Sequence, residues 1–222
     1  PFSDFLGIAP LCNLNPTGHT LPTKHLYFCG VAGSTATIYF PADARLTLIA
    51  QSENLTLSTT DYSLNFSPCK ELGAYFLHVL TLDNGWASQI GSFSGCSTYT
   101  TGGQTYRYCS KNVSIDVSAG QVVGTAKFQA CWDFGVRDSR IASLGFVNPA
   151  RYRTASDNLD DLHVACGLDY LAEPYKSQLK ARLGQADGTV LRSSAPVCGT
   201  SMQDVANSAQ GNWFSSGAGY PA

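Results

Sequence analysis

The sequence predicts a mainly β protein: a disulfide-bonded β sandwich followed by one helix and an irregular tail. Two observations lead to this fold class. Short segments rich in β-branched and aromatic residues alternate with turn residues from position 24 to position 136. Eight cysteines are spread along a chain in which only 14% of the residues are charged. We therefore expect a β-sandwich domain over residues 1–150 and a helix-plus-tail extension, packed on the sandwich, over residues 151–222.

The predicted strands are short, and Gly, Asn, Asp, Ser or Pro separates each from the next. A further segment, YTTGGQTYRYC at residues 99–109, predicts a hairpin with Gly102 and Gly103 at its tip. In chain order the predicted strands span residues 35–40, 44–50, 54–58, 62–66, 74–82, 113–117, 121–126 and 130–136.

One helix is predicted after the strands, in the segment LAEPYKSQLKARLG at residues 171–184. Its apolar side chains recur at helical spacing, and Gly184 is well placed to end it. These apolar residues are Leu171, Tyr175, Leu179 and Leu183.

The tail from residue 199 to residue 222 is polar and rich in small side chains. Trp213 and Phe214 are its expected large apolar anchors. We expect both rings to be buried against the domain, because burial of a large aromatic ring contributes several kcal/mol. The rest of the tail should lie irregularly on the surface.

An even number of scattered cysteines, with no Cys-x-x-Cys pair, indicates disulfides rather than a zinc ribbon. Disulfides place the chain in an oxidising compartment, secreted or periplasmic. The alternative is a cytosolic protein with buried free thiols. Cys96 and Cys109 flank the hairpin tip and are expected to pair, as are Cys166 and Cys198, which flank the helix. Three pairings stay open for the remaining cysteines, which are Cys12, Cys29, Cys69 and Cys131.

The net charge of −2 gives no electrostatic reason to bind nucleic acid or an anionic membrane. No apolar run approaches the ~20 residues that span a bilayer, so no membrane span is expected. No phosphate-binding loop, dinucleotide fingerprint or nucleophile elbow is present. The sequence leaves the oligomeric state open.

Histidine and carboxylate side chains are the candidates for chemistry. Side chains of a strand alternate between faces, so His25 should share a face with Tyr27 and Cys29. By the same rule Asp133 should share a face with Cys131, and His78 should share one with Phe76 and Leu80. Pro22 interrupts regular structure between His19 and His25, which allows the loop to return His19 towards the strand.

If the three strands are neighbours, His19, His25, His78 and Asp133 converge on one cleft. Imidazoles and a carboxylate suit a divalent metal ion, with zinc as the first choice and iron or copper as alternatives. In a competing interpretation the histidines are ordinary strand residues, and an arginine such as Arg137 or Arg140 holds Asp133.

A second acidic group, Asp157, Asp160 and Asp161, lacks the glycine and the alternating oxygen ligands of a calcium loop. We interpret it as a solvated acidic loop. His163 has no partner motif, so we assign it a structural role.

One sequence order resembles a known family. An aromatic-x-x-His stretch that ends at His78 is followed by V-x-x-G-Q-x-x-G-T at residues 117–125 and then by an alternating strand that ends in Phe-Gly-Val. This order resembles the lysostaphin-type zinc endopeptidases, which cut peptide cross-links of bacterial cell walls on a duplicated-hybrid-motif β sandwich. The resemblance covers roughly residues 18–136.

The resemblance implies roles for particular residues. His78 matches the family's catalytic histidine, and His19 and His25 fall where its early zinc ligands lie. Cys131 and Asp133 stand in the place of the family's late His-x-His pair, and neither is histidine. The resemblance thus implies metal ligation by His19, His25 and Asp133 and acid–base catalysis by His78.

These features predict an extracellular metal-dependent hydrolase, divergent from the cell-wall endopeptidases. Its partner would be a peptide or a cell-wall or glycan polymer, and a metal-bound water would be its nucleophile. One alternative is a non-catalytic binding or structural module that kept the sandwich and lost hydrolysis. Another is a metal site with redox chemistry.

Overall fold

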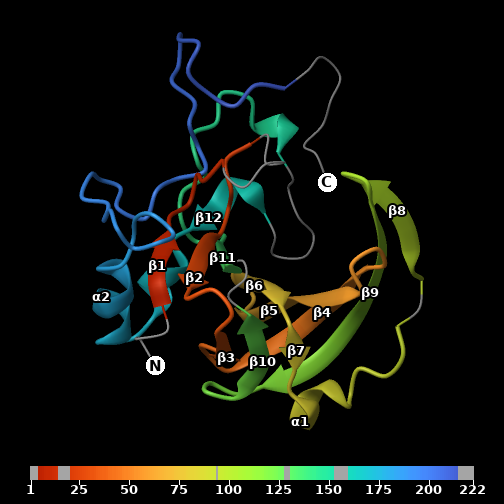
Figure 1. Cartoon of the computed structure of the whole chain (residues 1–222). Helices are drawn as coiled ribbons and strands as arrows, with labels where there is room; N and C mark the ends of the chain where they lie inside the picture. Colours follow the sequence, from red (N-terminus) through yellow and green to blue (C-terminus); the bar gives the residue numbers. More distant parts are fainter. Residues whose placement is uncertain (1–4, 15–20, 94, 128–130, 153–159, 215–222) are drawn as a thin grey trace.

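The computed structural model describes residues 5–14, 21–93, 95–127, 131–152 and 160–214. Two antiparallel β-sheets contain most of the regular structure (Figure 1). The predicted mainly β fold is therefore confirmed. The larger sheet has the strand order β1-β2-β11-β6-β5-β4-β9-β8, and β12 pairs with β11 beside this path. Its strands are β1 (Phe5–Ala9), β2 (Leu26–Gly30), β4 (Ala44–Asn54), β5 (Thr59–Cys69), β6 (Leu72–Val79), β8 (Ser97–Thr101), β9 (Gln104–Val117), β11 (Trp132–Asp138) and β12 (Val164–Ala165).

The smaller sheet has the order β3-β10-β7 and covers part of one face of the larger sheet. Its strands are β3 (Thr35–Tyr39), β7 (Thr81–Leu82) and β10 (Val122–Lys127). Apolar side chains of both sheets form one buried core. In it the rings of Phe40 and Phe66 make an edge-to-face contact, with their centroids 5.6 Å apart. Gly124 lets β10 approach β7 closely, since a Cβ there would lie 1.7 Å from the Thr81 carbonyl oxygen.

Long strands carry the larger sheet beyond the sandwich. β4, β5 and β9 curve away from the core, and β8 lies at their outer edge (Figure 1). The predicted hairpin at residues 99–109 is confirmed as β8 and β9, with Gly102 and Gly103 in the left-handed region. We call this projecting part of β4, β5, β8 and β9 the wing.

The predicted strand at residues 54–58 is wrong, because this segment forms the turn between β4 and β5. The Asn54 side chain accepts hydrogen bonds from the backbone N–H groups of Thr56 and Leu57. Asparagine favours such turns by bonding to the backbone that follows it. The turn that Asn54 stabilises therefore outweighs the strand preference of the leucine and threonine residues that follow it.

The predicted helix at 171–184 is much shorter than expected, since α2 spans only Tyr175–Lys180. Pro174 explains the late start, because the residue before a proline is kept out of the helical region. Leu171 closes a preceding 3₁₀ turn, η4 (Gly167–Tyr170). The other short helices of the described residues are α1 (Asn84–Ala87), η2 (Pro149–Arg151) and η3 (Asp161–His163).

Trp213 and Phe214 differ in their environment. Trp213 is 73% exposed, so the expectation that it is buried is wrong. Its indole N–H donates to the Ala209 carbonyl, 2.9 Å away, and this local bond holds the ring on the surface. Phe214 makes an edge-to-face contact with Tyr152.

Three disulfides connect the described residues. The expected pairs Cys96–Cys109 and Cys166–Cys198 are both present. Of the pairings that the sequence left open, Cys29–Cys131 forms, and it joins β2 to the start of β11. Cys12 and Cys69 are free. Disulfides of this number are typical of proteins from oxidising compartments.

The C-terminal segment returns to the N-terminal edge of the larger sheet. Ile8 in β1 donates its N–H to the Arg182 carbonyl and accepts from the N–H of Gly184. Leu168 and Leu183 belong to the same buried core as the sheets. Within the described residues, no helix is long and apolar enough to cross a membrane.

Candidate functional site

Three adjacent strands bring the predicted site residues together. In the larger sheet β11 lies between β2 and β6, and Asp133 is directly opposite Tyr27 on one side and Leu77 on the other. Asp133 points away from the core that contains Trp132 and Phe134, as alternation requires. Its carboxylate meets the side chains of His25 and His78. His19 lies outside the described residues.

His25 is buried beside Asp133, and its two ring nitrogens face different groups. Its Nδ1 lies 3.2 Å from the Tyr75 hydroxyl, and its Nε2 lies 3.3 Å from Asp133 Oδ2. The Tyr75 hydroxyl donates its single proton to the Lys24 carbonyl, so it accepts from the Nδ1–H of His25. When the ring is neutral, this bond places its proton on Nδ1 and leaves the Nε2 lone pair facing Asp133.

His78 approaches the same carboxylate oxygen from the solvent side. Its Nδ1 lies 3.1 Å from Asp61 Oδ2, and its Nε2 lies 3.7 Å from Asp133 Oδ2. Half of the His78 side chain is exposed, whereas Asp133 is buried. Each histidine therefore has its Nδ1 held by a neighbour and its Nε2 directed at Asp133.

Alternation alone would place His78 on the core face with Phe76, and this part of the sequence argument is wrong. The register between β5 and β6 shifts by one residue between the pairs Tyr62–Val79 and Leu64–Phe76. His78 takes a left-handed backbone conformation at this bulge, with φ of 61°. A bulge re-aims a side chain, and here it turns the imidazole out of the core towards Asp61 and Asp133.

Burial shapes the electrostatics of the carboxylate. Desolvation raises the pKa of Asp133 to about 7, although the nearby His78 acts in the opposite direction. Within the described residues, Asp133 Oδ1 is buried without a hydrogen-bond partner. The hydrogen bond to Asp61 is the main cause that raises the pKa of His78. The site thus combines a buried carboxylate that binds protons readily with an imidazole that solvent reaches.

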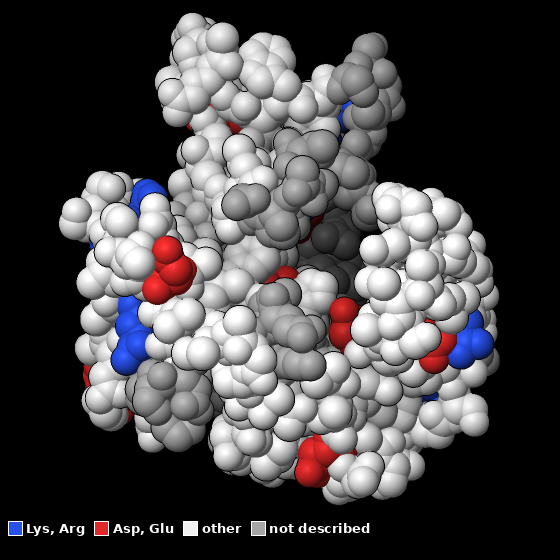
Figure 2. Space-filling view, viewed as in Figure 1, with Lys and Arg blue, Asp and Glu red and all other residues white. Residues whose placement is uncertain are grey.

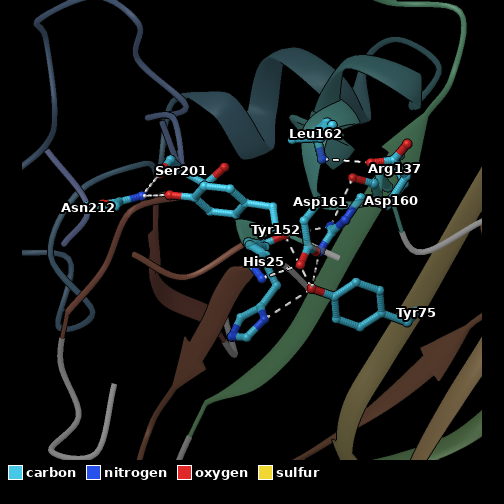
Figure 3. Close-up of polar contacts among 11 residues, drawn as sticks. His25, Tyr75, Arg137, Tyr152, Asp160, Asp161, Leu162, Ser201 and Asn212 are labelled. Carbon is cyan, nitrogen blue, oxygen red and sulfur yellow. Dashed lines mark hydrogen bonds and ion pairs between the residues drawn. The ribbon is translucent and has the colours of Figure 1, made fainter. Parts of the chain in front are cut away.

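Buried polar groups on the Nδ1 side of His25 hold its ring in place (Figure 3). The Tyr75 hydroxyl lies between His25 and the Arg137 guanidinium. Arg137 and Lys24 both form ion pairs with Asp161, whose side chain is fully buried. These contacts fix the Tyr75 ring and, through it, the orientation of the His25 imidazole.

The same contacts correct two interpretations of the sequence. Arg137 pairs with Asp161 and Arg140 pairs with Asp138, so neither of these arginines holds Asp133. Asp161 is not part of a solvated acidic loop, because two cations neutralise it in the interior. The Nδ1 of His163 pairs with Asp160 Oδ2, 2.9 Å away.

The described residues supply only part of a metal site. His25 Nε2 and Asp133 Oδ2 are 3.3 Å apart, which suits neighbouring ligands of one tetrahedral ion with metal–ligand bonds of about 2.0–2.1 Å. The tautomer of His25 also suits a ligand, since metal-binding histidines commonly donate their other N–H to a second group. Even so, no group of three or more His, Cys, Asp or Glu side chains in the described part of the chain is arranged to hold a metal ion.

Two residues of this site carry no sequence signal of their own. Asp61 orients His78, and Tyr75 orients His25, but each lies in an ordinary strand pattern. Only the register of β6 against β5 and β11 reveals them.

Searches of protein-family models, of curated proteins and of solved structures find no match to this chain.

Proposed function

We propose that this chain is an extracellular metal-dependent hydrolase that acts on a peptide or glycan polymer. The observation that carries the proposal is the common orientation of His25 and His78. Both rings direct Nε2 at Asp133 Oδ2, and both have Nδ1 held by a neighbouring side chain. A structural histidine needs no such arrangement, whereas a ligand and an acid–base group do. The resemblance to lysostaphin-type enzymes and the three disulfides support the hydrolytic and secreted parts of the proposal.

In this proposal, zinc is the first-choice metal, His25 and Asp133 are two of its ligands, and His19 is the predicted third. A bound divalent ion would supply a nucleophilic water at neutral pH. Tyr75 keeps the Nε2 lone pair of His25 directed at the site. Trp132 and Phe134 flank Asp133 in sequence and pack in the core, which fixes the β11 backbone that carries the carboxylate.

His78 has the position of the acid–base residue. It is half exposed, so a substrate reaches it, and Asp61 holds its Nδ1 in the way that a third group orients a catalytic base. Its Nε2 is then free to take a proton from an attacking water and return it to the leaving group. The left-handed backbone at His78 agrees with this role, because strained conformations cluster at functional sites.

The test measures metal content and hydrolysis in the same set of variants. Purified full-length protein is analysed for bound zinc and assayed on purified bacterial peptidoglycan, with released amines reporting peptide cleavage and reducing ends reporting glycosidic cleavage. Asp133→Asn and His25→Ala should lose both zinc and activity. His78→Gln should keep zinc and lose activity at least a hundredfold, in line with general acid–base catalysis. His163→Gln, which alters a histidine outside the site, is the matched control.

Two results would contradict the proposal. If no zinc binds to the wild type, or if the His78 and Asp133 variants hydrolyse as well as the control, these residues do not form a reaction centre. The alternative of a non-catalytic binding module would then replace the hydrolase.

A further inference from the structure

The wing presents three tyrosines on the face that carries the candidate site. Tyr106 and Tyr108 alternate with Arg107 along β9, and Tyr99 lies directly opposite Tyr106 on β8. Tyr99 is 47% exposed and Tyr108 is 38% exposed. The rings of Tyr99 and Tyr106 are nearly parallel, with centroids 5.4 Å apart. We call these three residues the tyrosine platform.

Strand register connects the tyrosine platform to the reaction centre. Tyr108 lies opposite Ser52 on β4, and Ser52 lies opposite Asp61 on β5. Asp61 is the residue that binds His78. With strands about 4.8 Å apart, the Cα atoms of Tyr108 and Asp61 are separated by roughly 10 Å. A polymer of a few units can therefore contact the tyrosines and His78 at the same time.

The side chains on the surface between the tyrosine platform and Asp61 are small and uncharged. By alternation, these residues lie on the same face of the sheet as the tyrosines. Their side chains are short, so the tyrosines and the site project above them, and we call these residues the floor. Asp61 is the only charged residue among these positions, and it is paired with His78. Glu53 and Arg107 bind each other on the opposite face. Figure 2 shows few charged side chains over β8 and β9 and a hollow beside them. The floor residues that solvent reaches are Ser52, Ser63 and Ser110, and Ala50 between them is buried.

A chain of hydrogen bonds fixes the position of Tyr106 before any ligand arrives. Its hydroxyl donates to Gln104 Oε1 at 2.7 Å, and the same oxygen accepts from the Asn54 side-chain amide at 2.6 Å. Asn54 is itself held by the backbone of the β4–β5 turn. A ring that is already ordered loses little conformational entropy on binding.

We propose that the tyrosine platform binds a neutral β-1,4-linked hexopyranose chain and leads it to His78. The negative face of an aromatic ring attracts the C–H bonds on the flat face of such a sugar. The serine hydroxyls of the floor can both donate and accept hydrogen bonds with sugar hydroxyls. The lack of free charge favours a neutral chain over an anionic one. The choice of this chain as substrate rests on the proposed function, whereas binding to the platform does not.

The test is calorimetric titration of full-length Asp133→Asn protein, which is expected to be inactive, with cellohexaose and with chitohexaose. At least one of these probes should bind, and adding Tyr99→Ala or Tyr108→Ala should weaken binding at least tenfold. Tyr39→Ala is the matched control, because Tyr39 is 54% exposed on β3 of the other sheet. Unchanged melting temperatures would show that the variants are folded.

Binding of neither probe, or equal binding by the platform variants and the Tyr39 control, would overturn the proposal. Binding of an uncharged Ala-Gly peptide in place of both sugars, lost in the same variants, would also overturn it and make the wing a peptide groove. Failure of the hydrolase proposal has a different signature. In that case the sugars bind and depend on the tyrosines, but wild type and Asp133→Asn protein leave them equally intact.

Discussion

At the end of β11, the Asp138 carboxylate accepts hydrogen bonds from the Arg140 side chain and backbone and from the Tyr170 hydroxyl. The Arg140 guanidinium is the main cause that holds the pKa of Asp138 well below its usual range. Only 5% of the Asp138 side chain is exposed, although part of the Arg140 side chain is in solvent. The carboxylate is thus ionised in the folded protein at acidities that protonate an unfolded aspartate.

This difference predicts an acid-dependent loss of stability. A depressed folded pKa stabilises the protein above the unfolded pKa of about 3.9, and the effect disappears as the pH falls through the lower folded value. Asp138→Asn should therefore lower the melting temperature at pH 7, and the difference from wild type should shrink between pH 4 and pH 2. Asp116→Asn, which removes an exposed partner of Arg45, is the control. A difference that grows in acid would contradict the assignment.

The sequence indicates the important residues of the site better than it indicates their partners. His25, His78 and Asp133 can be selected because histidine and aspartate are rare in apolar strand patterns. Asp61 and Tyr75 cannot, since Asp61 lies just outside the predicted strand at 62–66 and Tyr75 is an ordinary aromatic residue of a strand. Each stands out only when its neighbour across the sheet is known. Partner identity depends on register, and a shift of one residue changes every contact.

Among the elements, β6 shows the limit of reasoning from alternation. The rule correctly separates Phe76 in the core from Tyr75 on the opposite face. It fails at His78, where the shifted register with β5 and a left-handed residue interrupt the pattern. Bulges depend on two strands together, so a single strand's sequence does not reveal them. The start of α2 is different, because Pro174 lies in the segment itself and removes the first turn that the apolar spacing predicts.

The packing of β6 on β11 gives a prediction at this scale. Gly135 faces Tyr75, and a Cβ at position 135 would lie 2.1 Å from the tyrosine ring. Gly135→Ala should lower the free energy of unfolding by about 1–3 kcal/mol, as overpacking does, and should displace the Tyr75 hydroxyl from His25. Chemical denaturation measures the first effect, and the NMR shifts of the His25 ring report the second. Gly145→Ala is the control, because a Cβ there meets nothing within 4 Å. Equal stability of the two variants would contradict the packing argument.

At the scale of the whole molecule, the C-terminal segment is joined to the larger sheet by charge as well as by apolar contact. Asp161 in η3 forms ion pairs with Lys24, which precedes β2, and with Arg137 in β11. The acidic segment around Asp161 lacks the features of a calcium loop and so suggests a solvated loop, and the two cations that pair with Asp161 are distant in the chain. Long-range ion pairs leave no local pattern, which is why this contact could not be predicted.

Removing this carboxylate should be costly. Asp161→Asn leaves two cations buried without their counter-charge, so we expect a loss of about 3–5 kcal/mol in the free energy of unfolding. Asp169→Asn is a matched control, since Asp169 also pairs with two cations, Lys176 and Lys180, but is half exposed. Its loss should be about 1 kcal/mol or less. Urea denaturation of both variants measures the difference, and similar losses would show that burial of Asp161 contributes little.

The two edges of the larger sheet differ in what they offer to another molecule of the same chain. At one edge, residues 182–184 already occupy the hydrogen-bonding groups of Ile8 in β1. At the other edge, every residue of β8 is exposed, and its outer side faces no other strand of the described structure. Unpaired strand edges are templates for strand addition. Aggregation of the folded protein by edge pairing should therefore begin at β8 and join copies through their wings, and charged substitutions that favour solubility belong on that strand.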